Sequence, residues 1–97
     1  MSELAVEQIE KGSLGAFLLK SEGKRLGEMV YTRISPDQIT IEHTEVDQSL
    51  RGKGASRKLL DALVAWARAS KTRVAATCPY ASAQFEKDAS IQDVYVR

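Results

Sequence analysis

The chain has 97 residues, with 43% hydrophobic side chains, 28% charged side chains and a formal net charge of +1. At this length we expect a single domain over residues 1–97, built around one hydrophobic core. The small net charge argues against a nucleic-acid-binding protein, and no apolar stretch approaches the roughly 20 residues of a membrane span, so neither nucleic acid nor a membrane is an expected partner.

Four β-strands are predicted in the first half of the chain. The first two are short β-prone segments separated by Lys11-Gly12, and the third alternates in polarity after a turn at residues 21–24. A proline turn at residues 35–37 precedes the fourth, which is rich in β-branched residues. The predicted strands cover residues 4–9, 13–19, 26–34 and 39–46.

The fourth strand carries polar side chains towards its carboxyl end. Strict alternation predicts that two isoleucines and two polar residues share one face: Ile39, Ile41, His43 and Glu45. The opposite face would then hold Thr40, Glu42, Thr44 and Val46. The apolar face therefore becomes polar where the strand ends.

A helix and a fifth strand are predicted next. From about Gly52 the apolar residues recur every three or four positions as far as Ala67, which indicates an amphipathic helix. Residues 72–78 form a short apolar run stopped by Pro79, and a strand reached through a crossover helix is expected to lie parallel to the fourth. Residues 81–88 can form two helical turns, and residues 93–97 are ambiguous. This pattern predicts the α+β class.

The turn before the long helix has the features of an anion site. Gly52 and Gly54 allow close approach of a ligand to the backbone, and the first N–H groups of a helix lack intrahelical partners. Arg51 and Lys53 add positive charge. An ordinary surface loop remains the alternative, because Gly-x-Gly alone is weak evidence. The spacing excludes a P-loop and a dinucleotide fingerprint.

These residues resemble the acetyl-CoA site of the GCN5-related N-acetyltransferases. The family pattern is Gln or Arg, two residues, Gly, one residue, and Gly or Ala; Arg51 and Gly54 match it, and Ser56 departs from it. Together with residues 42–46 and 77–80, the pattern is similar to the small single-domain YjdJ-like subgroup. The resemblance implies a minimal, sandwich-like form of the fold: a twisted, mainly antiparallel sheet, a parallel pair of fourth and fifth strands, and one main helix.

The resemblance also implies where acetyl-CoA would bind. Backbone groups of Thr44 and Val46 would pair with the pantetheine arm, Arg57 would add charge, and Tyr80 would line the channel. The pyrophosphate would be held by amides of the glycine turn: Arg51, Gly52, Lys53, Gly54, Ala55 and Ser56. No metal is expected.

Three side chains are candidate catalytic groups for acetyl transfer to an amine. His43 could act as a general base, because histidine is the residue type that most often does so near neutral pH, and Glu45 could act through a water molecule. Cys78 could protonate the departing thiolate or become acetylated itself, and we expect it to converge with His43. Each also has a structural interpretation: a hydrogen-bonded strand histidine, a solvated carboxylate and a small buried hydrophobe.

Two functions remain open at this point. The first is an N-acetyltransferase with an open acceptor site for a protein lysine, an N-terminus or a polyamine. The second is a non-catalytic module that binds acyl-CoA or a protein partner. The single cysteine, Cys78, and the absence of a signal-like amino-terminal segment lead us to expect a cytoplasmic protein. A monomer or a weak homodimer is the expected oligomeric state.

Overall fold

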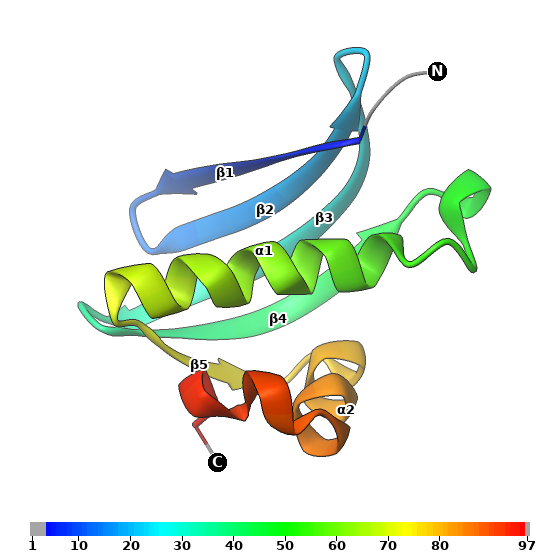
Figure 1. Cartoon of the computed structure of the whole chain (residues 1–97). Helices are drawn as coiled ribbons and strands as arrows, with labels where there is room; N and C mark the ends of the chain where they lie inside the picture. Colours follow the sequence, from blue (N-terminus) through cyan, green and yellow to red (C-terminus); the bar gives the residue numbers. More distant parts are fainter. Residues whose placement is uncertain (1–3, 97) are drawn as a thin grey trace.

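In the computed structural model, which describes residues 4–96, one five-stranded sheet is combined with two α-helices and two 3-10 helices (Figure 1). The strands follow one another across the sheet in chain order. They are β1 (Ala5–Lys11), β2 (Leu14–Ser21), β3 (Lys24–Ser35), β4 (Gln38–Val46) and β5 (Arg73–Ala76). The helices are η1 (Gln48–Leu50), α1 (Ala55–Ser70), α2 (Pro79–Lys87) and η2 (Ala89–Val94).

The sheet is antiparallel from β1 to β4 and parallel between β4 and β5. The parallel pair extends from Gln38↔Arg73 to Ile41↔Ala76. It follows from α1, which carries the chain back across the sheet, since a parallel neighbour needs such a crossover. The predicted α+β class and the parallel pair are confirmed.

The core lies between α1 and one face of the sheet (Figure 1). Leu59 and Leu63 of α1 are fully buried, as are Tyr31 and Ile41 of the strands, while Phe85 of α2 closes the same core. Each such large apolar side chain contributes about 1.5–3 kcal/mol when it is buried. No helix in residues 4–96 has the length and apolar character needed to cross a membrane.

The segment at residues 93–96, whose sequence pattern is ambiguous, contacts β5 at the edge of the sheet. Its first residues end η2, Tyr95 forms an isolated bridge with Val74, and Val96 N–H donates to the Val74 carbonyl at 2.8 Å. Arg97 lies outside the described residues. The segment thus extends the contacts of β5.

A β-bulge in β4 changes which side chains face α1. Tyr31 pairs with Ile41, but the preceding residue, Val30, pairs with His43, so Glu42 is an extra residue in the ladder. Beyond the bulge the alternation is shifted by one, and Thr44 lies opposite the buried Met29.

The predicted grouping of side chains on this strand is therefore wrong beyond Ile41. Thr44 and Val46 lie on the core side with Ile41, whereas His43 and Glu45 are exposed on the other face. A period-two pattern does not reveal an inserted residue, because the bulge moves every later side chain to the other face without changing the β-rich composition of the strand.

Candidate functional site

The turn that precedes α1 adopts a conformation that favours glycine. Gly52 and Gly54 have φ angles of +76° and +75°, in the left-handed region. A Cβ built at either position would have no heavy atom within 4 Å, so open space lies beside both residues. The glycines therefore serve the backbone conformation and leave room for a ligand.

The amino terminus of α1 is electropositive. Gly54 is the N-cap and makes no side-chain capping bond, and the first turn contains no acidic residue. The first backbone N–H groups of a helix have no carbonyl acceptor within that helix, and the helix dipole adds partial positive charge at the same end. Arg51 and Lys53 lie beside this end in the chain. Such an arrangement favours a bound anion.

A cavity of about 360 Å³ opens at this end of the helix. It brings together many of the residues that the sequence predicted for coenzyme binding, and also Leu50, which the sequence analysis missed. The lining residues are Val46, Leu50, Arg51, Gly52, Gly54, Ala55, Ser56, Arg57 and Tyr80. Two other predicted residues, Thr44 and Lys53, are not part of this lining.

Next to the cavity, β4 and β5 separate. Their pairing ends at Ile41↔Ala76, and the N–H groups of Thr77 and Cys78 both donate to the Ile41 carbonyl, at 2.9 and 3.1 Å. Within residues 4–96, β5 offers no strand partner to the last five residues of β4.

The backbone of β4 presents hydrogen-bonding groups along this separation. Asp47 N–H points towards β3 and donates to the Leu26 carbonyl at 2.7 Å. Since backbone groups alternate in direction along a strand, those of Thr44 and Val46 point away from β3, into the separation. This edge of β4 can pair with an extended chain.

Cys78 lies at the start of α2, on the core side of β4. Its side chain is 3% exposed, and its Sγ is 3.3 Å from Oγ1 of Thr44. Pro79 begins the helix, where its missing N–H costs nothing. Tyr80 follows and lines the cavity, and burial raises the pKa of its phenol. The thiol therefore lies where β4 and β5 separate.

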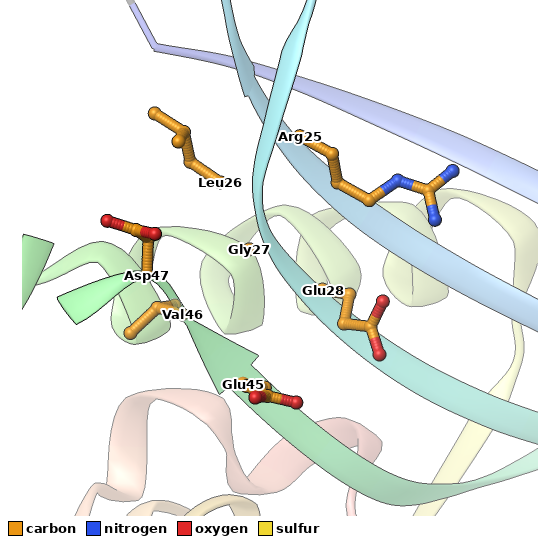
Figure 2. A pocket seen from close by; sticks show the side chains of 7 residues that line it. All are labelled: Arg25, Leu26, Gly27, Glu28, Glu45, Val46 and Asp47. Carbon is orange, nitrogen blue, oxygen red and sulfur yellow. The ribbon is translucent and has the colours of Figure 1, made fainter. Parts of the chain in front are cut away.

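His43 lies on the opposite face, beside two carboxylates. Its Nε2 is 3.2 Å from Oε1 of Glu45 and 3.9 Å from Oε2 of Glu28. Glu28 lies directly across the ladder from Glu45, and the two point in the same direction in Figure 2. Sequence reasoning missed Glu28, although the pairing of the two strands could have identified it.

A second cavity, of about 230 Å³, lies at this end of β3 and β4 (Figure 2). Its lining includes Val46, which also lines the cavity at α1. The remaining lining residues are Arg25, Leu26, Gly27, Glu28, Glu45 and Asp47.

The donor atoms of Glu28, His43 and Glu45 all lie within 4.8 Å of one another, close enough to reach one cation. All three side chains are at least partly exposed. Carboxylates beside a surface histidine are common without an ion, so this proximity alone does not identify a metal centre.

The structure does not bring His43 and Cys78 together on one face. The thiol faces the core with Thr44, and the imidazole is on the other side of the strand. The predicted convergence of these two side chains is wrong for the same reason as the predicted alternation: the bulge at Glu42 lies between Ile41 and His43.

Arg57 has partners that the sequence did not reveal. Its Nε donates to Asp61 and one Nη to Gln84, both at 2.8 Å, and its second Nη pairs with Asp88. These partners, above all Asp61 and Asp88, raise the pKa of the Arg57 guanidinium. Asp88 and Gln84 give no readable signal in the sequence, because only the docking of α2 against α1 brings them to Arg57.

Comparison with known proteins gives consistent matches. The family model described as GCN5-related N-acetyl-transferase matches residues 16–94. The solution structure of a GCN5-like protein from Staphylococcus aureus is 34% identical with a TM-score of 0.75, over 99% of this chain and 91% of that one. No curated protein matches significantly.

Two more distant structures share the fold. A ribosomal-protein-alanine N-acetyltransferase from Brucella melitensis biovar Abortus is 18% identical with a TM-score of 0.65, over 80% of this chain and 64% of that one. An aminoglycoside N-acetyltransferase solved with CoA is 13% identical with a TM-score of 0.63, over 94% of this chain and 88% of that one.

Proposed function

This chain belongs to the GCN5-related N-acetyltransferase family, and from that membership we propose that it binds acetyl-CoA at the amino terminus of α1 and transfers the acetyl group to an amine. The observation that carries the proposal is the left-handed glycine turn, with open space beside Gly52 and Gly54, at the start of α1, where the first helical N–H groups have no intrahelical acceptor. Membership of the narrower YjdJ-like subgroup stays a prediction.

The residues present fit a coenzyme with a diphosphate and an extended amide chain. Of the amides predicted to hold the diphosphate, those of Arg51 and Lys53 already donate within the turn, to the carbonyls of Gln48 and Leu50, so the prediction is wrong for these two. The amides of Gly52 and of residues 54–56 match the diphosphate, because backbone donors at a helix end bind anions. The outward backbone groups of Thr44 and Val46 match the pantetheine amides. Structural support for the ligand class comes from the related aminoglycoside enzyme, whose structure contains CoA.

The two proton transfers of the proposed reaction take place on opposite faces of β4. When bound, acetyl-CoA supplies an activated acyl group as a thioester. Nε2 of His43 takes the proton that the amine loses, directly or through a water held by Glu45, because both side chains lie on the open face. Sγ of Cys78 gives a proton to the departing sulfur on the core side, where Thr44 orients the thiol.

The acceptor amine approaches from the open face of β4 in this proposal. His43 and Glu45 are exposed, which suits a protein lysine, an N-terminus or a polyamine more than an enclosed metabolite. A cytoplasmic monomer or weak homodimer that needs no metal completes the proposal.

Calorimetric titration of the protein with acetyl-CoA tests the binding step. We expect saturable heat with one site per chain, and absence of heat would overturn the proposal. Release of free CoA thiol in the presence of a panel of lysine peptides, amino-terminal peptides and polyamines then tests transfer. Binding without release from any amine would favour the alternative function, a module that binds acyl-CoA without turnover.

Intact-mass spectrometry after incubation with acetyl-CoA separates the two chemical roles of Cys78. We expect no acetyl adduct, because in the proposed mechanism the thiol, hydrogen-bonded to Thr44, acts as a proton donor to the departing sulfur. An adduct that disappears in Cys78→Ala would assign the nucleophile role instead.

A further inference from the structure

One polar cluster joins α1 to α2 immediately beside the proposed coenzyme site. It consists of the Arg57 guanidinium with Asp61 on its own helix and with Gln84 and Asp88 at the end of α2, and we call it the Arg57 clamp. Arg57 is 31% exposed and Asp88 27% exposed, so the pair is partly shielded from water.

We propose that the Arg57 clamp is a positioning device that sets coenzyme affinity by holding α2 against the amino terminus of α1. The proposal rests on the proposed function. Arg57 itself lines the cavity, and so does Tyr80, the one lining residue contributed by α2. Gln84 and Asp88 lie outside the lining and reach it through their contacts with Arg57.

The geometry explains why this contact bears on the site. The cavity wall is made of Val46, the glycine turn, the first turn of α1 and Tyr80. The first three are continuous or nearly so in the chain, whereas Tyr80 arrives on a separate helix. The distance between that ring and the helix end therefore depends on how α2 is anchored. Ala81 and Phe85 bury one face of α2 in the core, and Arg57 adds hydrogen bonds from α1 to Gln84 of α2 and to Asp88, which directly follows α2.

The clamp also fixes the guanidinium. A free arginine beside a helix amino terminus would be repelled by the dipole and would spread over many rotamers. Asp61, Gln84 and Asp88 occupy three of its five N–H donors, so the remaining donors keep one orientation beside the cavity. The ligand then meets an ordered cation and an ordered wall.

A matched ion pair at the other end of the same helix provides a control. Arg68, near the carboxyl end of α1, makes a two-point contact with Asp93 of η2, at 2.8 Å from Nε and 2.7 Å from Nη2. This pair also ties α1 to the carboxyl-terminal segment, but neither residue lines the cavity at the glycine turn. Loss of the Arg68–Asp93 pair removes a comparable contact at the end of α1 opposite the proposed coenzyme site.

The test compares CoA affinity by calorimetry in the wild-type protein, Asp88→Ala, Gln84→Ala and Asp93→Ala. We expect Asp88→Ala and Gln84→Ala to bind CoA about threefold to tenfold more weakly, the range typical of coupling through a supporting residue. Asp93→Ala should bind like the wild type. Because Asp88 also caps η2 through Ser90, Gln84→Ala provides a variant that leaves that cap intact.

Rescue and stability separate positioning from general destabilisation. Asp88→Glu, which keeps a carboxylate, should recover most of the affinity, and the thermal midpoints of Asp88→Ala and Asp93→Ala should fall similarly. Wild-type affinity in both Asp88→Ala and Gln84→Ala, or an equal loss in Asp93→Ala, overturns the clamp alone. Failure of the wild-type protein to bind CoA overturns the proposed function and the clamp with it.

Discussion

At the scale of single residues, His43 and Cys78 have separate environments because they lie on opposite sides of β4. The imidazole lies beside the exposed carboxylate of Glu45 and the half-buried one of Glu28, whereas the thiol is buried against the hydroxyl of Thr44. In the proposed reaction this separation assigns the amine to the open face and the departing sulfur to the core side.

Replacement of His43 by glutamine tests that assignment. The amide keeps a polar group of similar size but cannot accept a proton at neutral pH, so kcat should fall by about 100-fold. Affinity for acetyl-CoA should not change, because His43 is absent from the lining of the cavity at α1. Glu42→Gln, on the same strand, is the control for surface charge. An unchanged kcat in His43→Gln would remove the histidine from the mechanism.

The carboxylate of Asp88 gives a prediction about pH and stability. Hydrogen bonds from Ser90 and then from Arg57 lower its pKa to about 2 in the folded protein, from an ordinary value of 3.8. The folded state therefore favours the charged form, and the stabilisation is complete above pH 3.8 and is lost as the pH falls through about 2.

The stability difference between wild type and Asp88→Asn should accordingly be constant from neutral pH to about pH 4 and then shrink towards pH 2. Thermal unfolding at each pH measures it. In Gln84→Ala, which removes a neutral acceptor, the difference from wild type should change less over the same interval. A difference for Asp88→Asn that persists undiminished at pH 2 would show that its carboxylate is not what stabilises the folded state.

At the scale of elements, the start of α1 was predictable, whereas the course of β4 was only partly so. Glycine, helical periodicity and local cations are encoded within a few residues, and the sequence placed the turn and the helix correctly. The bulge at Glu42 depends on how β3 and β4 fit together. The sequence therefore located the polar strand end but assigned its side chains to the wrong faces.

Gly54→Ala tests the glycine turn against a matched position. Gly54 and Gly12 both have positive φ, +75° and +62°, and open space where a Cβ would lie. Alanine at either should destabilise the fold by about 1 kcal/mol, because the left-handed region is unfavourable for a residue with a Cβ. Only Gly54→Ala should weaken acetyl-CoA binding, since Gly12 lies in the distant β1–β2 hairpin. Equal acetyl-CoA affinities of Gly54→Ala and Gly12→Ala, measured by calorimetry, would show that the glycine turn does not take part in binding the ligand.

At the scale of the whole molecule, the sheet order and the parallel pair were predictable because each follows from short connections and one crossover helix. The association of α2 and η2 with α1 was not. It combines burial of Phe85, Ile91 and Val94 in the core with ion pairs that Arg57 and Arg68 make with acidic residues more than 20 positions away, and no local pattern encodes such long-range contacts.

Leu63→Ala tests where the stability of this architecture resides. Leu63 is fully buried between α1 and the sheet, so its truncation should lower the free energy of unfolding by about 2–5 kcal/mol. Leu14 of β2 is 59% exposed, so Leu14→Ala should lower the free energy of unfolding by less than about 0.5 kcal/mol. Urea denaturation provides both values, and comparable costs would contradict a core centred on α1.

Titration of the isotope-labelled protein with acetyl-CoA, followed by amide NMR, tests the central claim most directly. We expect saturable shifts concentrated in residues 51–57 and along the outer edge of β4 at Thr44 and Val46, with the β1–β2 hairpin unchanged. Shifts confined to other surfaces, or none at millimolar coenzyme, would contradict the account of this site.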